Sequence, residues 1–237
     1  KIVSVPLDPK LPAEDLAVQL NEGECKAIFY SEYYAPTVEK IKEIGAPMDT
    51  YLYIPDFQKY IDEGEKLLAD GYTEYKDVVV SPDDLATIVF TSGTTGTSKG
   101  VMLTHRNFVA ATNGSDQSMT QFNRKNVFVD CLPMNHSYEI TCGQLAIQNL
   151  GATMVINDSI KNVLRNFVKY KPNALMLVPL YVETMYKKIW SEIDKKGMKK
   201  KVRTAMKISD ALLKVGIDMR EKFFSQITGA LGGNLKI

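Results

Sequence analysis

The sequence of 237 residues predicts an α/β protein with two lobes, each a mixed, largely parallel sheet flanked by helices. Three observations lead to this fold class. Short apolar runs alternate with amphipathic segments, as strands and helices do in a parallel sheet. Glycines close several of the amphipathic segments, as helix ends require. The length also suits one large or two modest domains, on a prior of roughly 100–200 residues per domain.

The first lobe is expected over residues 1–125. Its predicted strands are short and apolar: Ile2–Val5, Ala27–Tyr30 and Tyr51–Ile54. Its predicted helices are amphipathic, and a glycine follows each of them: Ala13–Leu20, Val38–Ile44 and Ile61–Ala69. The apolar run Leu85–Phe90 then leads into the loop 91–100, and a short apolar segment and a helix from Asn107 to about Met119 follow.

The second lobe is expected over residues 126–237, after a polar crossover at Gln121–Asn126. Its predicted strands are again apolar: Val127–Leu132, Ala152–Ile156 and Ala174–Val178. Its predicted helices are Tyr138–Leu150 and a segment from Asp158 or Ser159, as the cap, to Tyr170. From about residue 181 to 224 the pattern is helical and basic, and Gly233–Ile237 looks like the start of another strand.

The bulk composition excludes several classes of protein. Apolar residues make up 45% and charged residues 24%, which is ordinary for a globular domain. A net charge of +1 argues against a general nucleic-acid binder, which usually shows a strong basic excess. No apolar run approaches the roughly 20 residues of a membrane-spanning helix. The three widely spaced cysteines, Cys25, Cys131 and Cys142, form no disulfide framework, so we expect a reducing, cytoplasmic setting.

The loop 91–100 reads TSGTTGTSKG and has the chemistry of a phosphate site. Glycines without a Cβ let backbone amides approach an anion closely, and successive amides form an anion-binding nest. The six hydroxyl side chains are donors that can also ligate Mg²⁺. Lys99 supplies a compact positive charge. The loop is therefore expected to hold a phosphate chain.

Two other interpretations of this loop fit less well. A flexible surface linker does not usually hang directly on an apolar strand. A Walker-type loop requires the spacing G-x-x-x-x-G-K-[ST]. Here two residues separate Gly96 from Lys99, Gly100 follows the lysine, and the next residues look like a strand rather than a helix. The helix N-terminus that anchors phosphates in Walker loops is therefore not expected.

Residues 91–105, TSGTTGTSKGVMLTH, closely resemble the phosphate-binding signature of the adenylate-forming superfamily of acyl- and aryl-CoA synthetases, adenylation domains and luciferases. Ser98 departs from the proline that is more usual there. The resemblance extends over essentially the whole chain. Pro6–Pro9 resembles an upstream turn of the family, and Gly232–Lys236 resembles the lead-in to its adenine-binding strand. Cys131–Glu139 (CLPMNHSYE) and Val178–Tyr186 are most similar to long-chain fatty acid–CoA ligases.

The resemblance implies a partial AMP-binding domain and a two-step reaction. A fatty acid carboxylate attacks the α-phosphate of ATP, and coenzyme A then displaces AMP from the acyl-adenylate. It assigns the β- and γ-phosphates to a set of loop residues: Ser92, Gly93, Thr94, Thr95, Gly96 and Lys99. It places Thr91 near Mg²⁺ and His136 near the reacting carboxylate, so that Lys99 and His136 are the expected catalytic residues.

Alternatives remain open at this point. His136 is equally well read as a structural histidine after a buried strand, and Cys131, His136 and Cys142 offer a weaker zinc-like set at an unusual spacing. A phosphate-transferring NTPase, a non-enzymatic nucleotide- or acyl-binding module, and an aryl- or short-chain acid ligase are the rival functions. The formation of AMP rather than ADP would separate the NTPase from the ligase.

The ends of the chain favour a fragment, because both look like the middle of a strand and residue 1 is lysine. By the resemblance, the adenine- and ribose-binding segments and the C-terminal domain with its catalytic lysine are absent. We therefore expect the piece to be inactive alone.

The basic segment 187–207 has two readings, a solvated helical hairpin or a peripheral contact with the anionic inner face of a membrane.

Overall fold

The computed structural model describes residues 1–46, 48–92, 98–157 and 162–235. The chain forms two compact units. The first comprises residues 1–111 with 134–137, and the second comprises residues 112–133 with 138–237. The predicted lobe boundary near residue 125 lies inside the second unit, and the division into lobes at that point stays a prediction.

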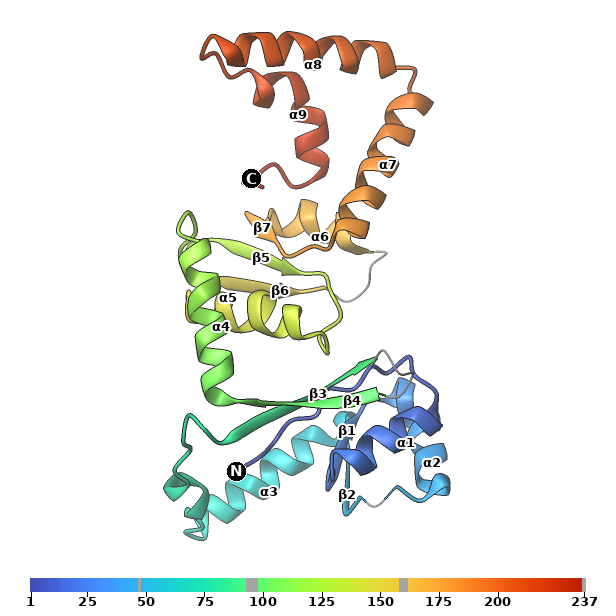
Figure 1. Cartoon of the computed structure of the whole chain (residues 1–237), viewed down its shortest axis with the longest axis vertical. Coiled ribbons are helices and arrows are strands. Elements are labelled where there is room, and N and C mark those ends of the chain that lie inside the picture. The colour runs from blue at the N-terminus through green and yellow to red at the C-terminus, as the bar shows by residue number, and fades with distance from the viewer. Residues whose placement is uncertain (47, 93–97, 158–161, 236–237) are drawn as a thin grey trace. The chain divides into compact units, whose positions relative to one another are not determined.

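The first unit opens with alternating helices and short strands (Figure 1). The strands β1 (Ala27–Tyr30) and β2 (Thr50–Tyr53) pair in parallel, with Ala27 opposite Thr50. The helices are α1 (Ala13–Glu22), α2 (Ala35–Ile44) and α3 (Phe57–Ala69), and the 3₁₀ turns are Glu32–Tyr34, Ile54–Asp56 and Glu74–Asp77. These elements confirm the predicted order to within a few residues.

A small core joins α1 to α2. Leu16, Ala17 and Leu20 of α1 pack with Ile41 of α2, and each of these side chains is nearly fully buried. Gly45 ends α2 with a φ of 86°, a left-handed conformation that a glycine adopts without strain. Gly45 therefore caps the C-terminus of α2, as the sequence predicts.

The strand predicted at Ile2–Val5 does not form. Ser4 makes only an isolated parallel bridge to Thr87, with its amide donating to the carbonyl of Ala86 at 3.0 Å. Ile2 is 90% exposed, so its side chain gains nothing from burial. An apolar run is not enough to make a strand when only one residue finds a partner.

An antiparallel hairpin completes the first unit. It consists of β3 (Leu85–Ser92) and β4 (Ser98–Thr104). The short apolar segment expected at 101–104 is therefore the second half of a longer strand. The helix α4 (His105–Ser118) follows β4 directly. Arg106 at the start of α4 forms a salt bridge with Asp83, which lies just before β3. Its Nε donates to Oδ1 at 2.8 Å and its Nη2 donates to Oδ2 at 3.0 Å, and both side chains are exposed.

The second unit is built on a parallel three-stranded sheet in the order β6-β5-β7. The strands are β5 (Val127–Asp130), β6 (Thr153–Ile156) and β7 (Ala174–Leu175). Phe128 and Val129 of β5 are fully buried in two different clusters, because successive side chains of a strand point to opposite faces. Phe128 packs with Met119, Ala146 and Ile147, and Val129 packs with Val163 and Phe167.

The segment after β5 departs from the expected α-helix over Tyr138–Leu150. It is a π-helix at Glu139–Leu145 that continues as the short α5 (Ala146–Asn149). The helix α6 (Val163–Tyr170) is confirmed for its described part, while its predicted caps, Asp158 and Ser159, lie outside the described residues.

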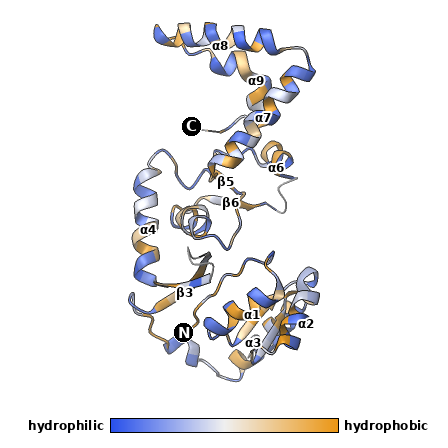
Figure 2. Cartoon of the chain, turned by 45° about the vertical axis from the view of Figure 1, so that its right-hand side comes forward, coloured by the Kyte–Doolittle hydropathy of each residue, from blue (hydrophilic) through white to orange (hydrophobic). Residues whose placement is uncertain are grey.

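The C-terminal part is helical, as the sequence predicts. It consists of α7 (Pro179–Lys195), α8 (Lys199–Lys214) and α9 (Arg220–Ala230). Hydrophilic and hydrophobic residues alternate along these helices (Figure 2). The strand expected at Gly233–Ile237 does not begin at Asn234 or Leu235, and the last two residues lie outside the described part. Within the part of the chain that is described, no helix combines the length and the apolar character needed to cross a membrane.

Candidate functional site

The hairpin of β3 and β4 presents the two ends of the predicted phosphate loop. Thr91 lies directly opposite Lys99 in the antiparallel register, and Ser92 lies opposite Ser98. Thr91 and Lys99 are both exposed. The predicted binding residues Gly93, Thr94, Thr95 and Gly96 lie outside the described residues, and only the backbone of Ser92 is described. The hairpin therefore brings a hydroxyl and an ammonium group together at the end of one pair of strands.

Ser98 is anchored by two side-chain contacts that the sequence did not reveal. Its Oγ accepts a hydrogen bond from Nε2 of Gln19 on α1 at 3.2 Å and donates to the carbonyl oxygen of Thr91 at 3.4 Å. Gln19 is buried, unlike most glutamines. A proline at position 98, as is usual in the resembled signature, has no hydroxyl for either contact. Gln19 thus supports the end of the loop, and no sequence motif marks it.

Gly100 serves packing within the hairpin. A Cβ built on it would lie 2.9 Å from Cγ2 of Ile88 and 3.3 Å from the ring of Phe90. Contacts this short force a neighbour to move. The glycine therefore lets β4 lie close against the side chains of β3.

Replacing Gly100 by alanine is expected to destabilise the hairpin by about 1 kcal/mol because of this overlap. Amide hydrogen exchange of the β3 and β4 residues should then become roughly fivefold faster. The matched control is Gly64→Ala in α3, where an added Cβ meets nothing within 4 Å and helix propensity favours alanine. Equal or slower exchange in the Gly100 variant would contradict this account of the glycine.

A magnesium ion would find few ligands among the described residues near the hairpin. Thr91 offers one exposed hydroxyl, and the described part of the chain contains no group of three or more His, Cys, Asp or Glu residues that could hold a metal. Mg²⁺ commonly keeps several waters and binds through substrate phosphates and one or two protein groups. The residues present therefore fit an ion that arrives with a phosphate chain.

His136 lies in a bend after β5 and its side chain is exposed. Residues 134–137 belong to the same compact unit as the hairpin, although the residues on either side belong to the second unit. The alternative of a zinc-like set with Cys131 and Cys142 finds no support. Cys131 is buried, while Cys142 lies 3.2 Å from the hydroxyl of Ser115, and the described residues form no three-ligand group here.

Cys131 is also a poor metal ligand on electrostatic grounds. Its burial, together with the nearby carboxyls of Asp130 and Glu139, raises the pKa of its thiol to about 12. Because a thiolate is the metal-binding form, this thiol stays protonated and inert near neutral pH.

Two buried carboxyl groups flank the segment of His136 in the sequence. Asp130 ends β5 and Glu139 begins the π-helix, and their side chains are 3% and 0% exposed. Both carboxyl oxygens of Glu139, and Oδ2 of Asp130, lack a hydrogen-bond partner of good geometry among the described residues. Burial, followed by the nearby carboxyl group of Asp130, raises the pKa of Glu139 to about 8. The folded protein therefore favours the protonated form of Glu139 more than the unfolded chain does.

Gly143 makes the space for this acid. It lies four residues after Glu139 in the π-helix, and a Cβ at this position would overlap the carboxyl group of Glu139. Single π-turns in helices often occur at functional sites. The sequence shows the pattern Glu139-x-x-x-Gly143, but nothing in its periodicity reveals that the two residues share one space.

The chain is similar in sequence to a known enzyme family and to its members. The family model described as "AMP-binding enzyme" matches residues 1–232. The long chain acyl-CoA synthetase 7, peroxisomal, of Arabidopsis thaliana is 29% identical over 217 residues, which cover 84% of this chain and 30% of that protein. The chain thus spans about a third of the length of that relative.

Solved structures share the fold at lower identity. The inhibitor-bound N-terminal domain of FACL13 from Mycobacterium tuberculosis aligns with a TM-score of 0.64 and 22% identity, over 77% of this chain and 45% of that one. ATP-bound MatB from Rhodopseudomonas palustris aligns with a TM-score of 0.55 and 21% identity, over 76% and 35% of the two chains. These structures show the fold. The match over residues 1–232 establishes that the chain belongs to the AMP-binding enzyme family, and it confirms the resemblance drawn from residues 91–105.

Proposed function

We propose that this chain is the phosphate-holding part of an AMP-forming fatty acid–CoA ligase. In this reaction a fatty acid carboxylate attacks the α-phosphate of ATP, pyrophosphate leaves, and the thiol of coenzyme A then displaces AMP. The hairpin that sets Thr91 opposite Lys99 is the observation that carries the proposal. Because the chain spans only 30% of its peroxisomal relative, the activity is proposed for the gene product that carries this sequence.

The residues of the loop have different parts in the proposed reaction. Lys99 offsets the negative charge that develops on the β- and γ-phosphates as pyrophosphate leaves. Ser92, Gly93, Thr94, Thr95 and Gly96 supply donors to the same phosphates. The Thr91 hydroxyl contributes to the surroundings of a Mg²⁺ ion that the nucleotide brings, and this ion would withdraw charge from the phosphate oxygens.

His136 is proposed to lie near the reacting carboxylate. Two observations support this role: the side chain is exposed, and its segment is grouped with the hairpin rather than with the flanking residues. An imidazole at this position can orient a carboxylate by donating a hydrogen bond.

The substrate class, the acceptor and the location complete the proposal. The name of the relative from Arabidopsis thaliana favours a long-chain fatty acid with coenzyme A as the acceptor. All three cysteines are free thiols, which favours a reducing compartment and hence the cytoplasm. The basic segment 187–207 is proposed to touch an anionic membrane surface, because its lysines at positions 199, 200 and 201 are all exposed at the start of α8.

The reaction is tested on the gene product that carries this sequence. We expect palmitate-dependent formation of AMP and pyrophosphate from ATP, and no palmitate-dependent ADP. Replacing Lys99 by alanine should lower the rate of pyrophosphate exchange by roughly a hundredfold, because a charged group that stabilises the transition state is lost. The matched control is Lys40→Ala on the exposed face of α2, which should leave the rate unchanged.

Two outcomes would contradict the proposal. The production of ADP in place of AMP would assign the loop to phosphate transfer. A Lys99→Ala variant with unchanged exchange would remove Lys99 from the phosphate site.

A further inference from the structure

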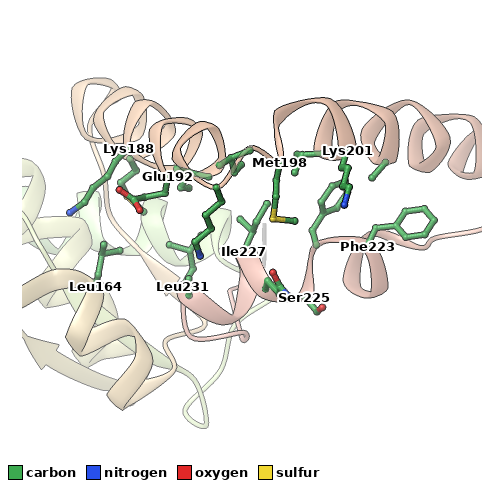
Figure 3. A pocket seen from close by; sticks show the side chains of 18 of the residues that line it. Leu164, Lys188, Glu192, Met198, Lys201, Phe223, Ser225, Ile227 and Leu231 are labelled. Atoms are coloured by element: carbon green, nitrogen blue, oxygen red, sulfur yellow. The ribbon is translucent and has the colours of Figure 1, made fainter.

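A cavity of about 590 Å³ lies among the helices α6, α7, α8 and α9 of the second unit (Figure 3). Its walls are largely apolar, and they include Met185 of α7 and Ile227 of α9. Four lysines line it, of which Lys188 of α7 and Lys201 of α8 lie toward opposite ends (Figure 3). These lysines therefore form no single anion site.

The hairpin of β3 and β4 is held at both of its ends. Near the open end, Oγ1 of Thr87 donates to the carbonyl oxygen of Ser4 at 2.7 Å, and Oγ of Ser4 donates to Oγ1 of Thr87 at 2.9 Å. At the end that carries the phosphate loop, Nε2 of Gln19 donates to Oγ of Ser98 at 3.2 Å. The loop end of the hairpin is therefore fastened to α1.

Helix α1 is a well-packed support for this contact. Leu16 and Leu20, before and after Gln19 in α1, are 4% and 3% exposed, and they pack with Ile41 of α2. Gln19 itself is 6% exposed. Because water has little access to its amide, solvent does not readily replace a lost partner there. Gln19 thus has a structural need for Ser98.

The hydroxyl of Ser98 connects both strands at the base of the loop. It accepts the hydrogen bond from Gln19 and donates its own proton to the carbonyl oxygen of Thr91 at 3.4 Å. A serine hydroxyl can do both at once, since it has one donor and two acceptor lone pairs. One side chain therefore joins α1, the start of β4 and the end of β3.

This contact also determines the face on which Lys99 lies. Successive side chains of a strand point to opposite faces, so a Ser98 side chain turned toward α1 leaves Lys99 on the face away from α1. Lys99 is exposed, and Thr91, directly opposite in the register, shares its face. A slip of one residue would exchange the two faces. Holding Ser98 in place therefore holds the ammonium group of Lys99 in place.

We propose that Gln19 is a positioning residue of the phosphate site, which sets Lys99 for ATP through the hydroxyl of Ser98. The inference rests on the proposed ligase function, because ATP is the ligand in question. Gln19 acts through Ser98 and brings no charge to the phosphates. Its loss should therefore weaken the binding of ATP more than it slows the chemical step.

The gene product that carries this sequence is used for the test. Its affinity for ATP with Mg²⁺ is measured by calorimetry, and its kinetics by palmitate-dependent pyrophosphate exchange. Gln19→Ala should raise the dissociation constant and the KM of ATP about fivefold to tenfold and change kcat by less than about twofold. Ser98→Ala should have the same effect, and the double variant should lose no more than either single one. Ser98→Thr keeps the hydroxyl and should bind ATP as the wild type does.

Leu16→Ala separates positioning from a general loss of stability. Leu16 lies three residues before Gln19 on α1 and is buried in the core. Its truncation should lower the melting temperature at least as much as Gln19→Ala does, because it leaves a cavity in that core. The affinity of the folded Leu16→Ala variant for ATP should stay unchanged.

Three results would overturn the proposal: an unchanged ATP affinity in Gln19→Ala, an equal loss of affinity in Leu16→Ala, or additive losses for Gln19→Ala and Ser98→Ala. The ligase function would survive each of them if Lys99→Ala still slows pyrophosphate exchange. Conversely, the formation of ADP in place of AMP, with an ATP affinity that depends on Gln19, would remove the ligase function and support the positioning role.

Discussion

Replacing Gly143 by alanine is expected to lower the free energy of unfolding of the second unit by roughly 3 kcal/mol. The added Cβ would overlap the carboxyl group of Glu139, which is fully buried. Helix propensity alone favours alanine over glycine by about 1 kcal/mol, so the packing account and the propensity account differ in sign. Urea titration followed by the fluorescence of Trp190, which lies in the same unit, measures the change.

A second substitution isolates the cause. In a Glu139→Ala background the overlap is gone, and the cost of Gly143→Ala should fall below about 1 kcal/mol. The control is Gly114→Ala in α4, where an added Cβ meets nothing within 4 Å. An equal cost of Gly143→Ala in both backgrounds would show that the glycine is required for the backbone of the π-helix and not for the acid beside it.

The free energy of unfolding is expected to fall as the pH rises from about 4.5 to about 8, and Glu139 is the cause. Its pKa in the folded protein, about 8, lies above its ordinary value of 4.5, so the folded state holds this proton more tightly than the unfolded chain. The stabilisation is therefore complete below pH 4.5 and is lost as the pH approaches 8. The slope contributed by one proton is at most about 1.4 kcal/mol per pH unit, which adds up to a few kcal/mol.

Glu139→Gln tests this dependence directly. The amide keeps the shape and can donate to Asp130, but it does not titrate. The difference in unfolding free energy between variant and wild type should therefore change by a few kcal/mol between pH 5 and 8, in favour of the variant at high pH. Glu65→Gln, at an exposed position on α3, should give a constant difference. A constant difference for Glu139→Gln as well would mean that the acid is ionised across the whole range.

Local sequence signals predicted most of the elements, because strands and helices of this size bury one face and end at identifiable residues. The predicted strand at Ala27–Tyr30 has the observed bounds of β1. Helix α2 ends where Gly45 predicts, since the glycine takes the left-handed conformation. Ile2–Val5 failed as a strand because strand formation needs a partner over several residues, and the tertiary structure supplies one bridge.

The parts of the site that the sequence did not reveal are contacts between distant residues. Gln19 reaches Ser98 across 79 positions of the chain. The space shared by Glu139 and Gly143 depends on a π-helix, whose register differs from the α-helix that the apolar pattern predicts. The excess of lysines around the cavity is visible in the sequence only as a basic helical segment, and its apolar interior comes from four separate helices.

The sequence by itself determined the fold class and the family, because the spacing within residues 91–105 and the alternation of strands and helices are local properties that survive without coordinates. The tertiary structure decided which groups share a dry environment. It raised the pKa of Glu139 and of the Cys131 thiol by burying them, and it formed an apolar cavity whose lining includes lysines that the sequence shows only as a charged segment. The physical reason is that pKa values and cavities depend on burial, and burial is set by residues far apart in the chain.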